Sequence, residues 1–158
     1  MSDCTNFVPH LVVSNAAKAI EFYKKAFGAT EVGRFTAPGT NKIMHAALDI
    51  RGGRLFVNDD FSESMGQKPT TPDALGGSPV TLHLQVENAD AAWKTAVAAG
   101  AHVTMPLADQ FWGERYGQLR DPFGHKWSIS QTVRKPTNEE LEKGARTSME
   151  HAREHAHA

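Results

Sequence analysis

Two stretches of the chain carry the same pattern: "PHLVVSNAAKAIEFYKKAFGAT" at residues 9–30 and "LHLQVENADAAWKTAVAAGAHV" at residues 82–103. At one constant offset the matched pairs are His10 with His83, Val13 with Val86, Asn15 with Asn88, and Ile20 with Trp93. Self-similarity at a fixed spacing indicates a duplicated structural unit, because each copy keeps the positions that its fold requires. The sequence therefore predicts two tandem copies of one unit in this chain of 158 residues.

Each copy begins with the signals of a strand followed by a helix. Apolar residues alternate with polar ones around Leu11, which is typical of a half-buried strand. Asn15 then stands where a side chain accepts from the free amides of a first helical turn, and Gly28 stands where a helix ends in a left-handed residue. Asn88 and Gly100 repeat both signals in the second copy.

Each copy continues with three further strands. Residues 43–50 and 53–58 form a predicted hairpin around "RGG", and residues 115–120 and 126–131 form another around "DPFG". The "RGGRLFV" stretch from Arg51 matches "PFGHKWS" from Pro122. A strand, a helix and three strands, given twice, predict an α+β chain made of two βαβββ units.

The predicted units leave a connecting segment and a tail. Residues 1–60 form the first unit, 61–78 a linker or flap rich in Pro and Gly, 79–133 the second unit, and 134–158 a C-terminal helix with a His-rich tail. Thr137 and Glu140 have the spacing of a capping box at the start of that helix. His151 and His155 lie one helical turn apart, and we interpret them as part of an exposed polar tail rather than as metal ligands.

Composition excludes several classes of protein. A net charge of −1 provides no basic field for nucleic acid or an anionic membrane surface, and no apolar run reaches the length of a membrane span. Cys4 is the only cysteine, so no internal disulfide forms, and a reducing cytoplasm is the expected location. We expect neither nucleic acid nor a membrane among the partners.

Several motifs resemble a known superfamily. "AIEFYKKAFGA", "DQFWGERYG" and "DPFGHKWS" look like the vicinal oxygen chelate superfamily of glyoxalase I, bleomycin-resistance proteins and extradiol dioxygenases, and more narrowly like its PhnB-like branch. The resemblance implies a cupped mixed sheet with the helices on the outside. It also implies a homodimer or a pairing of units within one chain, and it leaves function open between metal enzymes and plain binding proteins.

The resemblance further implies where a metal would be held. Members with a metal place a His or Glu on the first strand and a Glu on the last strand of each unit. The corresponding positions in this chain are Val8, Val57, Thr81 and Ser128. None of these side chains is a competent ligand, and a shift of one residue brings only Pro9, Asn58, Leu82 and Ile129. We therefore expect no metal and no other cofactor at the superfamily's usual site.

The concave face nevertheless carries polar and aromatic candidates. Strand alternation predicts that His10, His45, Asp59 and His83 point into the concavity, where they line a binding site. The bend framed by Gly113 and Gly117 is expected to aim Trp112 and Tyr116 at a ligand, with the 61–79 loop near the mouth. Nearby, Glu114 and Arg115 are expected to form a local pair, and Trp127 is expected to pack beneath the second helix. The competing interpretation makes His10 and His83 hydrogen-bonded interior residues inherited from the duplication.

Three functions remain open at this point. The favoured one is the binding of a small, flat organic molecule in the concave sheet without the usual metal. The first alternative is a lyase, isomerase or dioxygenase-type enzyme that uses the cavity histidines or a non-standard divalent metal. The second alternative is a dimeric scaffold without chemistry.

Overall fold

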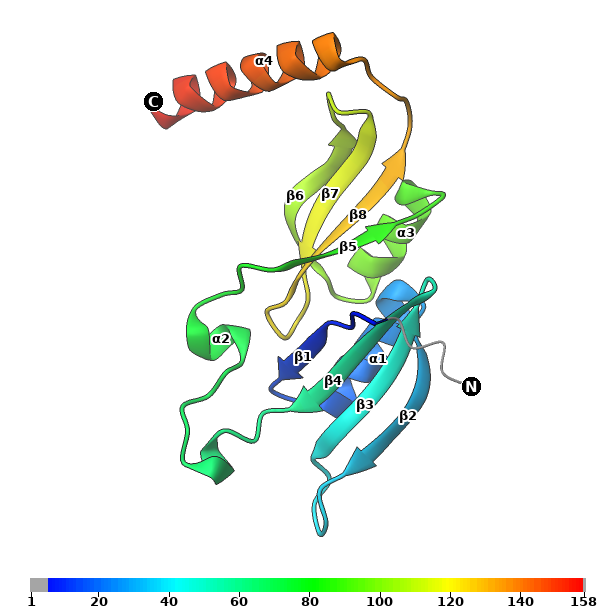
Figure 1. The fold of residues 1–158 in the computed structure, drawn as a ribbon, viewed down its shortest axis with the longest axis vertical. Coiled ribbons are helices and arrows are strands. Elements are labelled where there is room, and N and C mark those ends of the chain that lie inside the picture. The colour runs from blue at the N-terminus through cyan, green and yellow to red at the C-terminus, as the bar shows by residue number, and fades with distance from the viewer. Residues whose placement is uncertain (1–5, 158) are drawn as a thin grey trace.

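The computed structural model describes residues 6–157, so Cys4 lies outside the described residues. The first unit consists of β1 (His10–Val13), α1 (Ala16–Phe27), β2 (Thr30–Thr36), β3 (Ile43–Ile50) and β4 (Gly53–Asp59). The second consists of β5 (Thr81–Gln85), α3 (Ala89–Ala98), β6 (His102–Asp109), β7 (Glu114–Arg120) and β8 (Lys126–Thr132). The predicted pair of βαβββ units is confirmed, and Figure 1 shows one unit above the other.

Each unit forms its own mixed four-stranded sheet. The strand orders are β1-β4-β3-β2 and β5-β8-β7-β6, with the first strand of each unit parallel to the last and the other pairs antiparallel. No strand of one sheet pairs with a strand of the other in residues 6–157. The cup that the sequence predicts is therefore left open in a single chain.

The helix ends follow from single side chains. The Oδ1 atoms of Asn15 and Asn88 accept from the backbone amides of Lys18 and Ala91, both at 3.0 Å, as expected of N-caps. Gly28 ends α1 with a φ of 68°, a left-handed conformation that costs glycine little. These predicted boundaries are confirmed.

A second anchor holds each helix from the sheet below it. The amide of Ala16 donates to Asp59 Oδ1 at 2.8 Å, and in the other unit the amide of Ala89 donates to Gln131 Oε1 at 2.9 Å. Asp59 Oδ2 also accepts from the amide of Ile43 at 2.6 Å, and the residue is only 7% exposed. The prediction that Asp59 points into the concavity is wrong: its side chain lies beneath α1, where it satisfies two buried donors.

The two units share one core across α1 and α3, which pack against each other. Tyr23 donates its hydroxyl to Asp121 Oδ2 at 2.7 Å, and Trp127 Nε1 donates to the same oxygen at 2.9 Å. The Trp127 and Phe27 rings lie 4.3 Å apart. Trp127 was expected beneath the second helix, but these contacts place it against α1. Burial, reinforced by the Asp121 charge, raises the pKa of Tyr23 well above its ordinary value.

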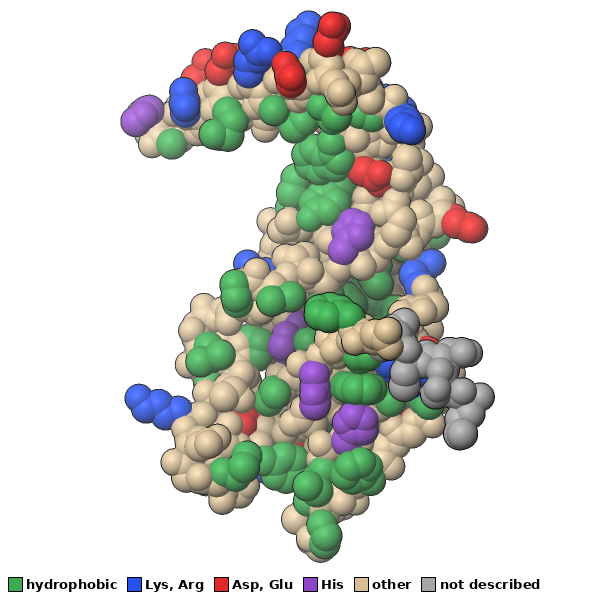
Figure 2. Space-filling view, in the orientation of Figure 1, with side chains coloured by type: hydrophobic (Ala, Val, Ile, Leu, Met, Phe, Trp, Pro, Cys, Tyr) green, Lys and Arg blue, Asp and Glu red, His purple; other side chains and the backbone are tan. Residues whose placement is uncertain are grey.

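The connecting segment and the tail carry short-range structure of their own. Residues 61–79 contain the one-turn helix η1 (Glu63–Met65) and the short helix α2 (Pro72–Leu75). The tail forms α4 (Asn138–Ala156) with the predicted Thr137–Glu140 capping box. Figure 2 shows α4 projecting past the second unit, with its hydrophobic side toward a hollow. Between residues 6 and 157, no helix combines the length and apolar composition needed to cross a membrane.

Candidate functional site

Helices cover one face of each sheet and leave the other face open. On the open face of the first sheet, the rings of His10 and His45 have centroids 5.9 Å apart, and Phe56 lies 5.7 Å from His10 and 4.6 Å from His45. Phe35 adds a fourth ring, 5.7 Å from His45. Neither imidazole has a hydrogen-bond partner within residues 6–157. This face is therefore an aromatic cluster that contains two unpartnered imidazoles.

The register of β4 differs from the sequence alignment by one residue. His10 pairs with Phe56, whereas the equivalent His83 pairs with Ser128, so Phe56 rather than Val57 is the counterpart of Ser128. Val57 is fully buried on the helix side. Because side chains alternate along a strand, a slip of one residue reverses every side chain. The expected position of Val57 in the usual metal site is therefore wrong, while Ser128 does lie on the open face beside His83.

The open face of the second sheet is a continuous hydrogen-bonded network. His83 Nδ1 lies 2.8 Å from Ser128 Oγ, and His83 Nε2 lies 3.1 Å from Gln85 Oε1. Gln85 Nε2 in turn donates to Glu114 Oε2 and to Thr132 Oγ1, both at 3.1 Å. The network ends at the Glu114 carboxylate, which also accepts from Ser130 at 2.6 Å and from Thr132 at 2.7 Å.

Glu114 determines the direction of this network. An ionised carboxylate only accepts, so the amide nitrogen of Gln85 faces it and the amide oxygen of Gln85 faces His83. His83 therefore donates through Nε2, and in its neutral form it accepts from Ser128 through Nδ1. The Ser130 hydroxyl, supported by Thr132 and Gln85, lowers the pKa of Glu114 below its ordinary value, since all three donors stabilise the charged form.

Aromatic rings extend the second open face. The Tyr116 ring stacks on His83 at 6.2 Å and 19°, and the Trp112 ring meets Tyr116 edge-on at 5.6 Å. Phe111 points elsewhere, since it packs against Gly144 of α4. The predicted residues His83, Tyr116 and Trp112 are thus brought together on one face, whereas His10 and His45 gather on the other sheet.

The adjacent residues Glu114 and Arg115 do not pair, although a local ion pair was expected. Arg115 points to the helix side, where it contacts Asp90 at 2.8 Å and Asp109 at 3.0 Å. Strand alternation separates the two charges onto opposite faces of the sheet. The sequence interpretation consequently missed Glu114 as a member of the open face.

A cavity of about 690 Å³ lies where the two units meet, between β1 and β4 on one side and β5 and β8 on the other. Its lining is mostly apolar: Leu11, Ile50, Leu55, Val80, Leu82 and Leu84. The imidazoles of His10, His83 and His125 also line it, and His125 Nε2 donates to the carbonyl of Val12 at 2.9 Å. Figure 2 shows histidines among hydrophobic side chains on this side of the molecule. His83 belongs to both the cavity and the second open face.

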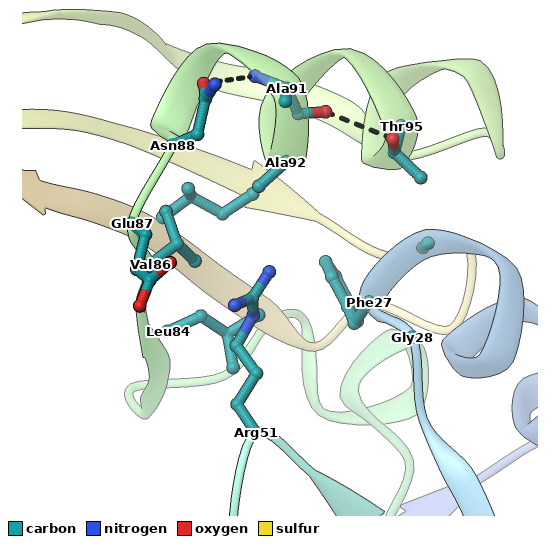
Figure 3. A pocket seen from close by; sticks show the side chains of 12 residues that line it. Phe27, Gly28, Arg51, Leu84, Val86, Glu87, Asn88, Ala91, Ala92 and Thr95 are labelled. Atoms are coloured by element: carbon teal, nitrogen blue, oxygen red, sulfur yellow. Dashed lines mark hydrogen bonds between the residues drawn. The ribbon is translucent and has the colours of Figure 1, made fainter.

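A smaller cavity of about 410 Å³ lies on the helix side of the same junction. Figure 3 shows Arg51 reaching into it toward Phe27, Val86 and Glu87, with Asn88 and Thr95 of the second unit above. Arg51 has a φ of 49°, the only positive φ of a residue other than glycine in the described chain. None of the predicted site residues lines this cavity.

Metal coordination requires several ligands that converge on one point. Within residues 6–157, no group of three or more His, Cys, Asp or Glu side chains is placed to hold a metal ion. In the tail, His155 Nδ1 lies 2.8 Å from the carbonyl oxygen of His151. The ring nitrogens of His10 and His45, which have no partner within residues 6–157, can form hydrogen bonds to a ligand.

Comparison with known proteins agrees with this architecture. A model of the Glyoxalase/Bleomycin resistance protein/Dioxygenase superfamily matches residues 5–129. The chain belongs to this superfamily.

Relatives of this superfamily member include an uncharacterised protein of Mycobacterium bovis, 51% identical over 85% of this chain and 88% of the relative. Among solved structures, TioX from Micromonospora sp. ML1 is 29% identical with a TM-score of 0.63, covering 82% of this chain and 99% of its own. The product of an Arabidopsis thaliana gene is 31% identical with a TM-score of 0.62, covering 80% and 98%. The superfamily accounts for the two units and the open faces, and it leaves the ligand to be argued from the side chains.

Proposed function

We propose that this superfamily member binds a small, flat organic molecule in the cavity between its sheets, with the second open face as an extension of the site. The observation that carries the proposal is the cavity itself. Its volume of about 690 Å³ lies within the range of small-molecule sites, and its lining is apolar with a few polar groups. Such a lining favours an apolar body that offers one or two hydrogen-bonding groups.

The rings beside the cavity favour a flat shape. His83 lines the cavity and stacks on Tyr116, which continues to Trp112. Aromatic faces at this spacing offer a stacking surface to a planar ligand. The hydrogen bonds that His83 forms with Ser128 and Gln85 hold its ring in place, so little side-chain entropy is lost when a ligand binds.

The same proposal includes a second copy of the chain as partner. The sheets remain separate, and their outer strands, β1 and β5 among them, keep unpaired edges within the chain. Phe35 is 57% exposed and Met44 47% exposed, which leaves apolar surface on the first unit. A homodimer that covers these edges would close the cup around the ligand. Sedimentation at micromolar concentration tests this assembly. A monomer under those conditions would contradict the proposed homodimer.

A titration with acridine, in a buffer that keeps this flat dye uncharged, tests the binding site. Val80 lines the cavity and is 59% exposed, so Val80→Trp fills the cavity without disturbing the core. We expect this change to weaken acridine binding by about tenfold, since the dye and the indole compete for the same space. The matched control Val97→Trp, at a 39% exposed position of α3 outside this cavity, should leave the affinity unchanged. Equal affinities in both variants, or no binding to the native chain, contradict the proposal.

A further inference from the structure

The hydrogen-bonded network of the second open face contains one carboxylate, that of Glu114. It is half-buried, and its oxygens accept from Ser130, Thr132 and Gln85. All three donors are neutral. Within residues 6–157 no lysine or arginine forms an ion pair with Glu114. The network therefore fixes the position of a negative charge without neutralising it.

One acceptor position on this carboxylate is still available. A carboxylate offers about four lone-pair positions. Gln85 and Ser130 share Oε2, and Thr132 alone uses Oε1. The free position on Oε1 can accept a hydrogen bond from a ligand, and a donor that carries positive charge gains most from it.

The rings around Glu114 favour the same kind of group. Tyr116 follows two residues later on the same face of β7, and Trp112 packs against it at 5.6 Å. Indole and phenol faces attract cations through their quadrupoles. Arg115, the cation nearest in sequence, is held on the opposite face by Asp90 and Asp109 and so cannot occupy this place.

We infer that the ligand of this site is a planar aromatic cation, or carries a protonated amine on its flat body, with the positive group at Glu114. This inference rests on the proposed binding of a flat molecule and adds its charge. The flat body lies along His83 and Tyr116, and the cationic edge donates to Glu114 Oε1 beside Trp112. Lysine-like and guanidinium-bearing side groups fit the same position by the same chemistry.

Two dyes of matched shape distinguish the effect of ligand charge on affinity from the effect of ligand shape. Proflavine is a flat tricyclic cation, and acridine is the same ring system kept uncharged. Fluorescence titration of the full chain is expected to show tighter binding of proflavine. Glu114→Gln keeps the size of the side chain and should weaken proflavine by about tenfold, because a charge-assisted hydrogen bond is lost, while acridine binding stays the same. Glu87→Gln removes an equal charge from an exposed position outside the face and should change neither affinity.

A measurement on the native chain covers the case in which Glu114→Gln fails to fold. Raising the salt concentration should weaken proflavine and leave acridine unaffected, because salt screens a charge pair and not stacking. If acridine binds but proflavine binds no tighter, or if Glu87→Gln weakens proflavine as much as Glu114→Gln does, the cation inference is overturned while the proposed function stands. If neither dye binds the native chain, the proposed function is overturned, and the inference with it.

Discussion

The two open faces share one strand order but differ in the hydrogen bonding of their side chains. On the first sheet, His10, His45 and Phe56 form a ring cluster in which neither imidazole has a hydrogen-bond partner within residues 6–157. On the second, the counterpart His83 is held by Ser128 and Gln85 in a network that ends at a carboxylate. Duplication thus preserved the strand order and the helix anchors, whereas the exposed side chains diverged. The second face therefore presents polar side chains that are held in one orientation.

The largest expected effect tests what the duplication preserved. Asp59→Ala should lower the free energy of unfolding by about 3 kcal/mol, because two buried backbone donors lose a charged acceptor. Gln131→Ala, which removes one neutral acceptor at the equivalent position, should cost only about 1 kcal/mol. Denaturant unfolding measures both. A stable Asp59→Ala protein with altered dye binding would instead place Asp59 in the concavity, as the sequence first suggested.

The next effect tests which face receives the ligand. Trp112→Ala should weaken acridine binding by about tenfold through lost stacking area. Phe56→Ala removes a ring from the other open face and should change the affinity by less than about twofold. Titration of the two variants side by side decides the matter, and a larger loss in Phe56→Ala would assign the ligand to the first sheet.

A smaller effect concerns acid stability of the first unit. Hydrogen bonding to Arg34, with help from Lys24, lowers the pKa of Glu31 from 4.5 to about 2. Because the folded pKa lies below the unfolded value, the stabilisation is present above pH 4.5 and is lost as the pH falls toward about 2. Thermal unfolding across this range should show a shallower acid loss for Glu31→Gln than for the native chain. Parallel profiles would mean that these partly exposed ion pairs contribute nothing measurable.

The smallest effect is spectroscopic. Neutral His83 should be a single Nε2–H tautomer, fixed by Gln85, whereas His10 and His45 should exchange between tautomers because nothing holds them. Long-range nitrogen–proton correlation spectra distinguish these cases. Finding all three histidines in one fixed tautomer would remove the contrast between the faces.

Much of this fold follows from local signals in the sequence. The side chains of Asn15 and Asn88 cap the starts of the helices, and Gly28 ends α1 through its left-handed backbone. The repeat predicted the remaining elements. The site residues were harder to predict from the sequence. The face of the sheet on which a side chain lies depends on how many residues the preceding turn contains. Two residues separate the paired Ile50 and Gly53, but three separate Asp121 from His125, whose backbones also bond.

The additional residue in the second turn explains why Val57 and Asp59 were assigned to the wrong face of the first sheet. The alignment of "RGGRLFV" with "PFGHKWS" matched Val57 to Ser128 in the sequence. In the structure Phe56 matches Ser128, and Asp59 therefore matches Gln131. Glu114 was missed for a different reason: its neighbour Arg115 suggested a pair that the alternation of the strand forbids. Both errors concern which side of a sheet a residue faces, which local sequence alone does not determine.

The link between Tyr23, Asp121 and Trp127 limits how this molecule can move. One carboxylate group bonds side chains of both units, and its second oxygen holds the turn that begins β8. Hinge motion between the units would break the buried Tyr23–Asp121 bond and separate the Trp127 ring from Phe27, so these contacts oppose such motion. If a ligand occupies the cavity as proposed, the segment from Ser78 to Val80 would contact it, because Ser78 and Val80 line the cavity just before β5. The rate at which the proposed ligand leaves would then respond to substitutions in that segment as well as in the two units it joins.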